Sequence, residues 1–265
     1  MQKGRGRPSG FFIFHFSFCI TEDGDRRPVE TCRWQATAAV APHRGVSTAC
    51  SLIMGLRNML KLAVLLSGSG RTLDNFYQHI DEGKLPAEVS VVIGSRPEAL
   101  GLEKAARRGT PTRCVERRKY ADTVSFSAAI TDVLRQYKPG LVLLAGFMHF
   151  YRVPDEYAGR AMNIHPALIP AFCGKGFYGH HVHEAVLKYG AKVSGCTVHF
   201  ADNIYDHGPI IIQRVVPVLE NDTPDTLAAR VFEQECIAYP EAIKLFGEGR
   251  LEIRDGRVRI KGPRS

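Results

Sequence analysis

The sequence predicts an α/β protein with a doubly wound, mostly parallel sheet and helices on both faces. Three observations favour this fold class. From residue 60 onwards, short apolar runs alternate with segments of helical spacing. The apolar runs are continuous, as in parallel strands that are buried on both faces. The 265-residue chain is 45% hydrophobic, which is enough for a sizeable core, and no stretch reaches the roughly 20 apolar residues of a membrane span.

The first half of the alternating region contains four predicted strands separated by three helices. The helix after the first strand places Leu73, Phe76 and Tyr77 on one side, which is the spacing of a helix that packs on a sheet. The predicted elements are, in order, strand Lys61–Leu66, helix Arg71–His79, strand Val89–Ile93, helix Glu98–Arg108, strand Thr112–Val115, helix Asp122–Tyr137 and strand Leu141–Leu144.

The second half has looser signals, with a strand that leads into a loop rich in Gly, Pro and His. Thr223 before Pro224 has the pattern of a helix N-cap, and Asp255 with Gly256 has the pattern of a hairpin turn. The predicted elements are strand Arg160–Ile164, helix His183–Tyr189, strands Val193–Phe200 and Ile210–Val218, helix Thr223–Phe246 and hairpin Leu251–Ile260.

The net charge of +8 is not spread evenly along the chain. Residues 1–58 carry eight Lys or Arg and four Asp or Glu, and residues 249–265 carry six and two. Residues 59–248 carry 21 of each and are therefore neutral. A neutral body argues against nucleic acid or an anionic membrane as the partner. We expect small-molecule substrates and a protein that is a monomer or a homodimer.

The first 58 residues show no helix or strand period after their apolar run. The basic start and the apolar run Phe11–Ile20 imitate a secretory signal, but the acidic stretch Glu22–Asp25 follows at once and no small-residue cleavage site is near. Two methionines just before the first strand favour an upstream-displaced start. We therefore expect residues 1–58 to be a poorly structured leader and residues 59–265 to be the folded domain.

The seven cysteines and a histidine-rich loop lack the spacing of a metal site. The cysteine count is odd, no C-x-x-C pair occurs and the spacings are wide, which indicates reduced thiols in a cytoplasmic protein. His180, His181, His183 and Glu184 do not form an H-E-x-x-H motif, and a loop that leads into a helix explains them better. No metal is therefore expected.

A glycine-rich turn, Ser67–Thr72, joins the first strand to the first helix. Its glycines let the backbone turn sharply and let an anion approach the N–H groups, and the helix N-terminus adds partial positive charge. Ser69, Arg71 and Thr72 add donors. The turn lacks the Gly-Lys-Ser/Thr ending of a P-loop and the third glycine of a dinucleotide motif. It favours a small phosphate monoester as ligand, although a tight structural turn would also explain the glycines.

Asn163 and His165 are two residues apart at the expected carboxyl end of a strand, so their side chains point to the same face. An amide donor beside an imidazole suits a carbonyl that becomes an oxyanion. Asp206 follows in a loop between two later strands, where a carboxylate can orient an imidazolium and raise its pKa. The Asn–His pair would equally serve to anchor a loop, and Asp206 to form an ordinary turn.

Taken together, these residues resemble the folate-dependent formyltransferases from about Leu60 to Ile260. The chain resembles most closely the branch that formylates phosphoribosylglycinamide in purine synthesis, because that branch has a phosphate loop after its first strand. The alternatives are a formyltetrahydrofolate deformylase, a methionyl-tRNA formyltransferase and a non-catalytic protein that binds a phosphate ligand. The motifs that carry the resemblance are Leu65–Gly70, Leu144–Met148, Asn163–Pro170, Gly195–His199 and Asp206–Pro209.

The resemblance implies the formyltransferase fold, 10-formyltetrahydrofolate as co-substrate and no metal. The substrate amine would attack the formyl carbon, Asn163 and protonated His165 would stabilise the oxyanion, and Asp206 would keep His165 charged. The implied site residues are Gly68, Ser69, Gly70, Arg71 and Thr72 for the substrate phosphate, Glu235 for the glycinamide end, Met148, His149, Phe150, Tyr151 and Asn163 for the folate, and Asn163, His165 and Asp206 for catalysis.

Two features depart from the family pattern. His149 stands where the family often has arginine, and Cys173–Gly179 forms a long insert after the Ile169-Pro170 turn. Both are expected near the entrance for the folate or the substrate.

Overall fold

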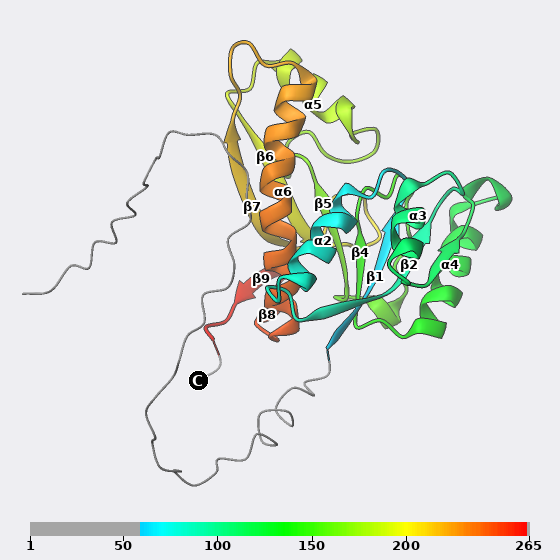
Figure 1. Ribbon diagram of the computed structural model, residues 1–265. Helices are drawn as coiled ribbons and strands as arrows, with labels where there is room; N and C mark the ends of the chain where they lie inside the picture. The colour runs from blue at the N-terminus through cyan, green and yellow to red at the C-terminus, as the bar shows by residue number, and fades with distance from the viewer. Residues whose placement is uncertain (1–58, 264–265) are drawn as a thin grey trace, which may run out of the picture. The chain divides into compact units, whose positions relative to one another are not determined.

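The computed structural model describes residues 59–263, and a seven-stranded sheet lies at the centre of these residues (Figure 1). The predicted leader, residues 1–58, lies outside the described residues. The strand order is β3-β2-β1-β4-β5-β6-β7, and β8 and β9 form a separate hairpin. The strands are β1 (Leu60–Leu66), β2 (Ala87–Gly94), β3 (Thr112–Cys114), β4 (Leu141–Leu144), β5 (Ala161–His165), β6 (Val193–Phe200), β7 (Ile210–Pro217), β8 (Leu251–Arg254) and β9 (Arg257–Ile260).

The sheet is parallel from β3 through β5, and β6 then runs antiparallel to both β5 and β7. The predicted class, a mostly parallel α/β sheet with helices on both faces, is therefore confirmed. The helices are α2 (Arg71–Asp81), α3 (Leu100–Arg107), α4 (Thr123–Tyr137), α5 (His180–Tyr189) and α6 (Pro224–Gly247), with short 3-10 turns at η1 (Arg117–Lys119) and η2 (Asp155–Tyr157).

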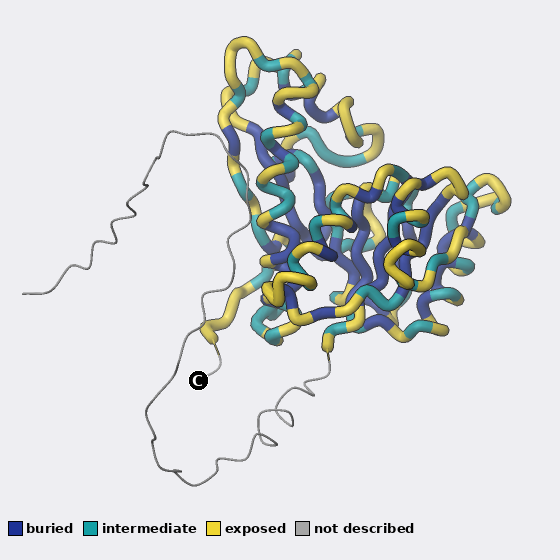
Figure 2. The backbone as a smooth tube through the Cα atoms, in the orientation of Figure 1, coloured by how far each residue is buried: buried dark blue, intermediate teal, exposed yellow. Residues whose placement is uncertain are grey.

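Side chains of β1 divide the core into two layers by strict alternation. Leu62, Val64 and Leu66 face a cluster built with α2, α5 and α6, whereas Ala63 and Leu65 face a cluster built with α4. All five are fully buried. Figure 2 shows that the central strands are mostly buried, whereas exposed residues lie mainly on the helices and loops around them. The continuous apolar run of β1 thus has the cause expected from the sequence.

Helix ends account for most of the boundary details. The Thr223 side chain accepts from a backbone N–H and forms a capping box, as predicted for the start of α6. The Asp122 side chain caps α4, so Asp122 precedes the helix instead of belonging to it. Helix α5 begins at His180, three residues earlier than predicted. The prediction missed these residues because the exposed His180 and His181 add no apolar period.

The start of β1 and the end of α6 lie close together. A Cβ built on Gly247, the last residue of α6, would lie 3.5 Å from the Leu60 side chain at the start of β1. This edge of the sheet is opposite to the carboxyl ends of the parallel strands. No helix within residues 59–263 has the length and apolar character needed to cross a membrane.

Candidate active site

A cleft with a volume of about 470 Å³ opens at the carboxyl ends of β1, β4 and β5. Parallel α/β sheets bind ligands at this edge. The structure brings every predicted site residue to this one cleft. The residues are Gly68, Ser69, Gly70, Arg71, Thr72, Met148, His149, Phe150, Tyr151, Asn163, His165, Asp206 and Glu235.

The glycine turn between β1 and α2 contains one glycine that the packing requires and one that borders empty space. Gly70 has φ +72°, and a Cβ there would lie 2.7 Å from Gly101 Cα, so only glycine fits. A Cβ on Gly68 would meet no atom within 4 Å. Gly68 therefore leaves room for a ligand beside the backbone. Arg71 opens α2 with its guanidinium 4.3 Å from the Phe232 ring centre, and this cation–π contact holds a positive charge at the cleft wall.

The loop after β4 is fixed to the glycine turn by a buried hydroxyl. Ser67 Oγ accepts from Met148 N at 2.9 Å and lies 2.6 Å from Ser95 Oγ. His149 packs edge-on against Phe126 of α4, and burial, aided by Arg117, lowers its pKa. His149 is therefore neutral at physiological pH, unlike the arginine expected from the family pattern.

The next two residues of this loop differ in exposure. The Phe150 ring lies 4.6 Å from the ring of Tyr205, which comes from the β6–β7 loop. Tyr151 is buried, its hydroxyl lies 3.0 Å from Thr131 Oγ1, and burial raises its pKa to about 12. The Tyr151 hydroxyl therefore bonds within the protein core, whereas Phe150 and Tyr205 form an aromatic edge of the cleft.

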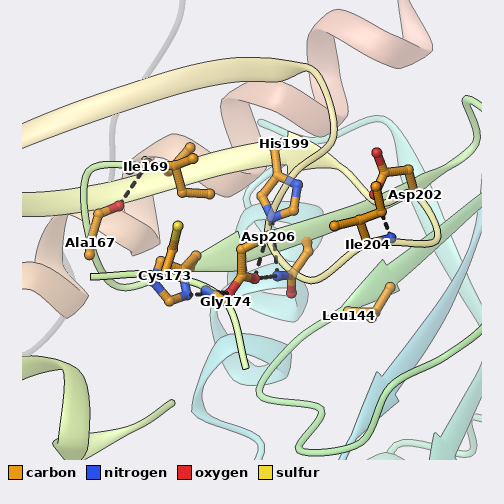
Figure 3. A network of polar contacts seen from close by, with 12 residues as sticks. Leu144, Ala167, Ile169, Cys173, Gly174, His199, Asp202, Ile204 and Asp206 are labelled. Atoms are coloured by element: carbon orange, nitrogen blue, oxygen red, sulfur yellow. Dashed lines mark hydrogen bonds and ion pairs between the residues drawn. The ribbon is translucent and has the colours of Figure 1, made fainter. Parts of the chain in front are cut away.

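Asn163, His165 and Asp206 line the cleft and meet in a polar network. Figure 3 shows Asp206 of this network with its neighbour His199. Asn163 Nδ2 donates to Asp206 Oδ1 at 3.2 Å, and His165 Nδ1 lies 3.5 Å from Asp206 Oδ2. His165 is buried and its Nε2 lies 2.8 Å from the Phe172 carbonyl oxygen. Asp206 reaches the pair from the β6–β7 loop with φ +49°. The two β5 side chains, Asn163 and His165, thus both lie close to Asp206, which is distant in the sequence.

His199 on β6 is a member of this network that sequence reasoning did not single out. The register of β5 and β6 places it opposite Asn163, and its Nε2 lies 3.2 Å from Asn163 Nδ2. Its Nδ1 donates to the Phe200 carbonyl at 2.9 Å, so Nε2 is the acceptor. Burial lowers the pKa of His199 and keeps it in the neutral form that this role needs.

Both hydrogens of the Asn163 amide are therefore engaged, one by His199 and one by Asp206. A carboxylate and an unprotonated ring nitrogen only accept, so the amide nitrogen must point towards them. A substrate oxygen that binds Asn163 as a donor has to replace one of these acceptors. The strand pairing opposite Asn163 was the signal that would have revealed His199.

The chain after His165 is held by the buried Thr197 of β6. Its hydroxyl donates to the Ala167 carbonyl at 2.7 Å and accepts from Ile169 N at 3.1 Å. The insert Cys173–Gly179 then forms one wall of the cleft. Gly174 N donates to Asp206 Oδ2 at 2.9 Å, and Figure 3 shows Gly174 beside Asp206. The insert therefore lies at the site, as expected.

Glu235 and Tyr239 occupy successive turns of α6 beneath the cleft. Burial raises the pKa of the Glu235 carboxyl to about 7, and the nearby Arg71 charge opposes this shift. The Tyr239 hydroxyl donates to the carbonyls of Leu144 and Met162, at 3.1 and 2.9 Å. Tyr239 thus ties α6 to the ends of β4 and β5.

The histidine cluster of α5 divides into separate environments. His180 lies 3.5 Å from Asp225 and His181 lies 3.2 Å from Glu184, both at the surface. His183 is buried at the cleft, and burial lowers its pKa to about 4. Within residues 59–263, no three His, Cys, Asp or Glu side chains gather in a group that could hold a metal ion.

Comparison with known proteins gives a consistent family. A model described as formyl transferase matches residues 60–243. The chain is 33% identical over 206 residues to the phosphoribosylglycinamide formyltransferase of Haemophilus influenzae, covering 77% of this chain and 95% of that protein. The glycinamide ribonucleotide transformylase 1 structure from Symbiobacterium toebii matches with a TM-score of 0.72 and 43% identity, over 77% of this chain and 95% of that one.

A longer relative matches over only part of its length. The trifunctional purine biosynthetic protein adenosine-3 of Gallus gallus is 37% identical over 198 residues, which are 74% of this chain and 19% of that protein. The chain therefore spans about a fifth of that relative.

Proposed function

This chain belongs to the formyl transferase family, and we propose that it transfers the formyl group of 10-formyltetrahydrofolate to the amino group of phosphoribosylglycinamide in purine synthesis. The observation that carries the proposal is one cleft that joins an open glycine turn to the Asn163–His165–Asp206 network. A phosphate site beside the network suits a small phosphorylated amine. A deformylase that uses water as acceptor has no need of such a site.

The substrate phosphate would bind at the glycine turn. The N-terminus of α2 presents N–H groups that have no partner within the helix, and Arg71 adds a fixed cation. Gly68 and Ser69 border the same space. Glu235 of α6, which lines the same cleft, would contact the amine end of the substrate, because a partly ionised carboxylate attracts an ammonium group.

The formyl group would be attacked at the Asn163–His165 pair. The incoming amine adds to the formyl carbon and charge builds on the formyl oxygen. The bond from the formyl carbon to the folate nitrogen then breaks, and the proton lost by the attacking amine passes to that nitrogen, which leaves as tetrahydrofolate. Asn163 Nδ2 and a protonated His165 would donate to that oxygen, and each such donor is typically worth about 3 kcal/mol in the transition state. Asp206, fixed by Asn163 and Gly174, would balance the charge of the imidazolium.

The folate would lie along Met148, His149 and Phe150, the loop that Ser67 holds beside the network. The neutral body of residues 59–248 supports small-molecule partners, and four free thiols among the described residues support a cytoplasmic location. We propose a monomer or a homodimer.

The test is an assay with purified protein and 10-formyltetrahydrofolate, with and without phosphoribosylglycinamide. We expect folate product only when the amine substrate is present. Product without the amine would indicate a deformylase, and no product in either case would indicate a non-catalytic binding protein. Formylation of methionyl-tRNA in a parallel reaction would indicate the tRNA branch.

Variants at the network sharpen this test. His165→Ala and Asp206→Asn are each expected to lower turnover by about 10²-fold or more while the thermal melt stays cooperative. His181→Ala is the matched control, because His181 is exposed and does not line the cleft. Near-normal turnover in either network variant would contradict the proposed mechanism.

A further inference from the structure

Each ring nitrogen of His165 has its own polar neighbour. Its Nε2 lies 2.8 Å from the Phe172 carbonyl oxygen, while its Nδ1 lies 3.5 Å from Asp206 Oδ2. His165 and Asp206 line the cleft, but Phe172 does not, and its side chain packs against the main core cluster. The carbonyl that contacts Nε2 therefore belongs to a residue outside the cleft lining, whereas Nδ1 lies beside Asp206, which lines the cleft.

This contact decides which ring nitrogen carries the proton. A carbonyl oxygen can only accept, so a 2.8 Å contact requires a proton on Nε2 of His165. In the neutral imidazole only one nitrogen is protonated, so Nδ1 then carries the lone pair. When the imidazole is charged, the second proton sits on Nδ1, beside Asp206 and the cleft.

The backbone at Phe172 is specialised for this contact. Phe172 has φ +50°, a conformation that a large aromatic residue rarely adopts. Its ring lies 5.8 Å from the Tyr189 ring in an edge-on contact at the end of α5. Strained backbone that the surrounding structure holds in place is concentrated at functional sites.

The same turn also holds the carboxylate of the network. Gly174, two residues after Phe172, donates its N–H to Asp206 Oδ2 at 2.9 Å. One short segment, Phe172–Gly174, therefore bonds one atom of His165 and one of Asp206. The acceptor at Phe172 and the donor at Gly174 match the two groups that they hold.

We propose that Phe172 is a positioning residue for formyl transfer: its carbonyl keeps the proton of neutral His165 on Nε2 and leaves Nδ1 as the nitrogen that faces the substrate. The Nε2–H bond persists through the reaction, and Nδ1–H is the histidine donor for the developing oxyanion. The mechanistic part of this inference rests on the proposed function, but the tautomer does not.

The first test needs no substrate and no measurement of activity. Full-length protein labelled with ¹⁵N-histidine is studied by NMR at a pH where the ring is neutral, and His165 is assigned by its absence in His165→Asn. We expect the Nε2–H tautomer, with Nδ1 showing the shift of an unprotonated nitrogen. An Nδ1–H tautomer, or an even mixture, would overturn the proposal whatever the enzyme activity.

The second test moves the carbonyl. Phe172→Pro cannot adopt φ +50°, so the carbonyl is displaced, whereas Phe172→Gly adopts it freely and keeps the carbonyl. We expect the proline variant to lose the tautomer preference and at least about tenfold in kcat, with KM for phosphoribosylglycinamide unchanged because Phe172 does not line the cleft. The glycine variant should stay within about threefold of the parent in kcat.

Two results of this comparison would overturn the proposal. One is a folded proline variant with the parental tautomer and kcat. The other is a glycine variant that loses as much kcat as the proline variant, since the ring and not the carbonyl would then position His165. If the proline variant does not fold, the tautomer of the parent protein still decides the inference.

Discussion

Replacing Glu235 with glutamine is expected to stabilise the folded protein at alkaline pH and to leave its stability unchanged in mild acid. Burial raises the pKa of this carboxyl to about 7, from an ordinary value of 4.5. Below about pH 4.5 the group is protonated in both the folded and the unfolded chain, and it does not affect unfolding. Between these values only the unfolded chain ionises, so the folded protein loses stability as the pH rises.

The magnitude follows from the two pKa values. The difference between about 7 and 4.5 corresponds to about 3 kcal/mol once the pH exceeds 7. Glu235 is half-buried, and water in the open cleft solvates part of the carboxyl, so we expect about 2 kcal/mol in practice. For a domain of this size that corresponds to a rise in Tm of roughly 4–8 °C at about pH 8.

The measurement is a series of thermal melts of parent and Glu235→Gln proteins between about pH 4.5 and pH 8. The difference in Tm should open as the pH rises and close in acid. Glu233→Gln is the matched control, because it makes the same exchange on α6 at an exposed position. A difference in Tm that does not vary with pH, or an equal gain in the control, would refute the reasoning.

Three further predictions concern the stability of the folded domain. Gly70→Ala should lose at least about 2 kcal/mol of stability, because its Cβ would clash with Gly101 at positive φ, whereas Gly68→Ala should melt like the parent; equal melts would contradict the packing. Tyr239→Phe should lose about 1–2 kcal/mol in urea titrations, since two strand carbonyls lose their donor, and an unchanged midpoint would contradict this. An arginine of α6 lowers the pKa of Asp222 below its ordinary 3.8, so Asp222→Asn should be less stable than the parent at neutral pH. That deficit should shrink as the pH falls below about 4, and a constant deficit would contradict the ion pair.

The central strands β1 and β4 were predictable because they are buried on both faces and therefore form unbroken apolar runs in the sequence. Strand β6 was predicted with its observed bounds, and β1 differs by one residue. The start of α5 was harder to predict, because its first two residues, His180 and His181, are exposed and polar and add no apolar period. Burial determines which parts of a helix leave a pattern in the sequence.

The residues of the candidate site were predictable where the proposed role belongs to the side chain and not to the backbone. Asn163, His165 and Asp206 have side chains whose chemistry suggests a role, and the structure brings them together. His199 belongs to the Gly195–His199 motif but was given no role, because a buried residue between apolar strand neighbours has no distinguishing spacing. Phe172 acts through its carbonyl, a group that every residue has, so its contribution depends on a backbone angle that the sequence does not display.

The closeness of Leu60 and Gly247 has a consequence for how such a domain can be combined with others. The start of β1 and the end of α6 both lie at the edge of the sheet opposite to the cleft. A further domain that is joined next to the start of β1 is attached at the edge opposite to the cleft, so the cleft would need no rebuilding. This arrangement suits a domain that is joined to others, and it is consistent with a relative in which the matching segment is 19% of a much longer chain.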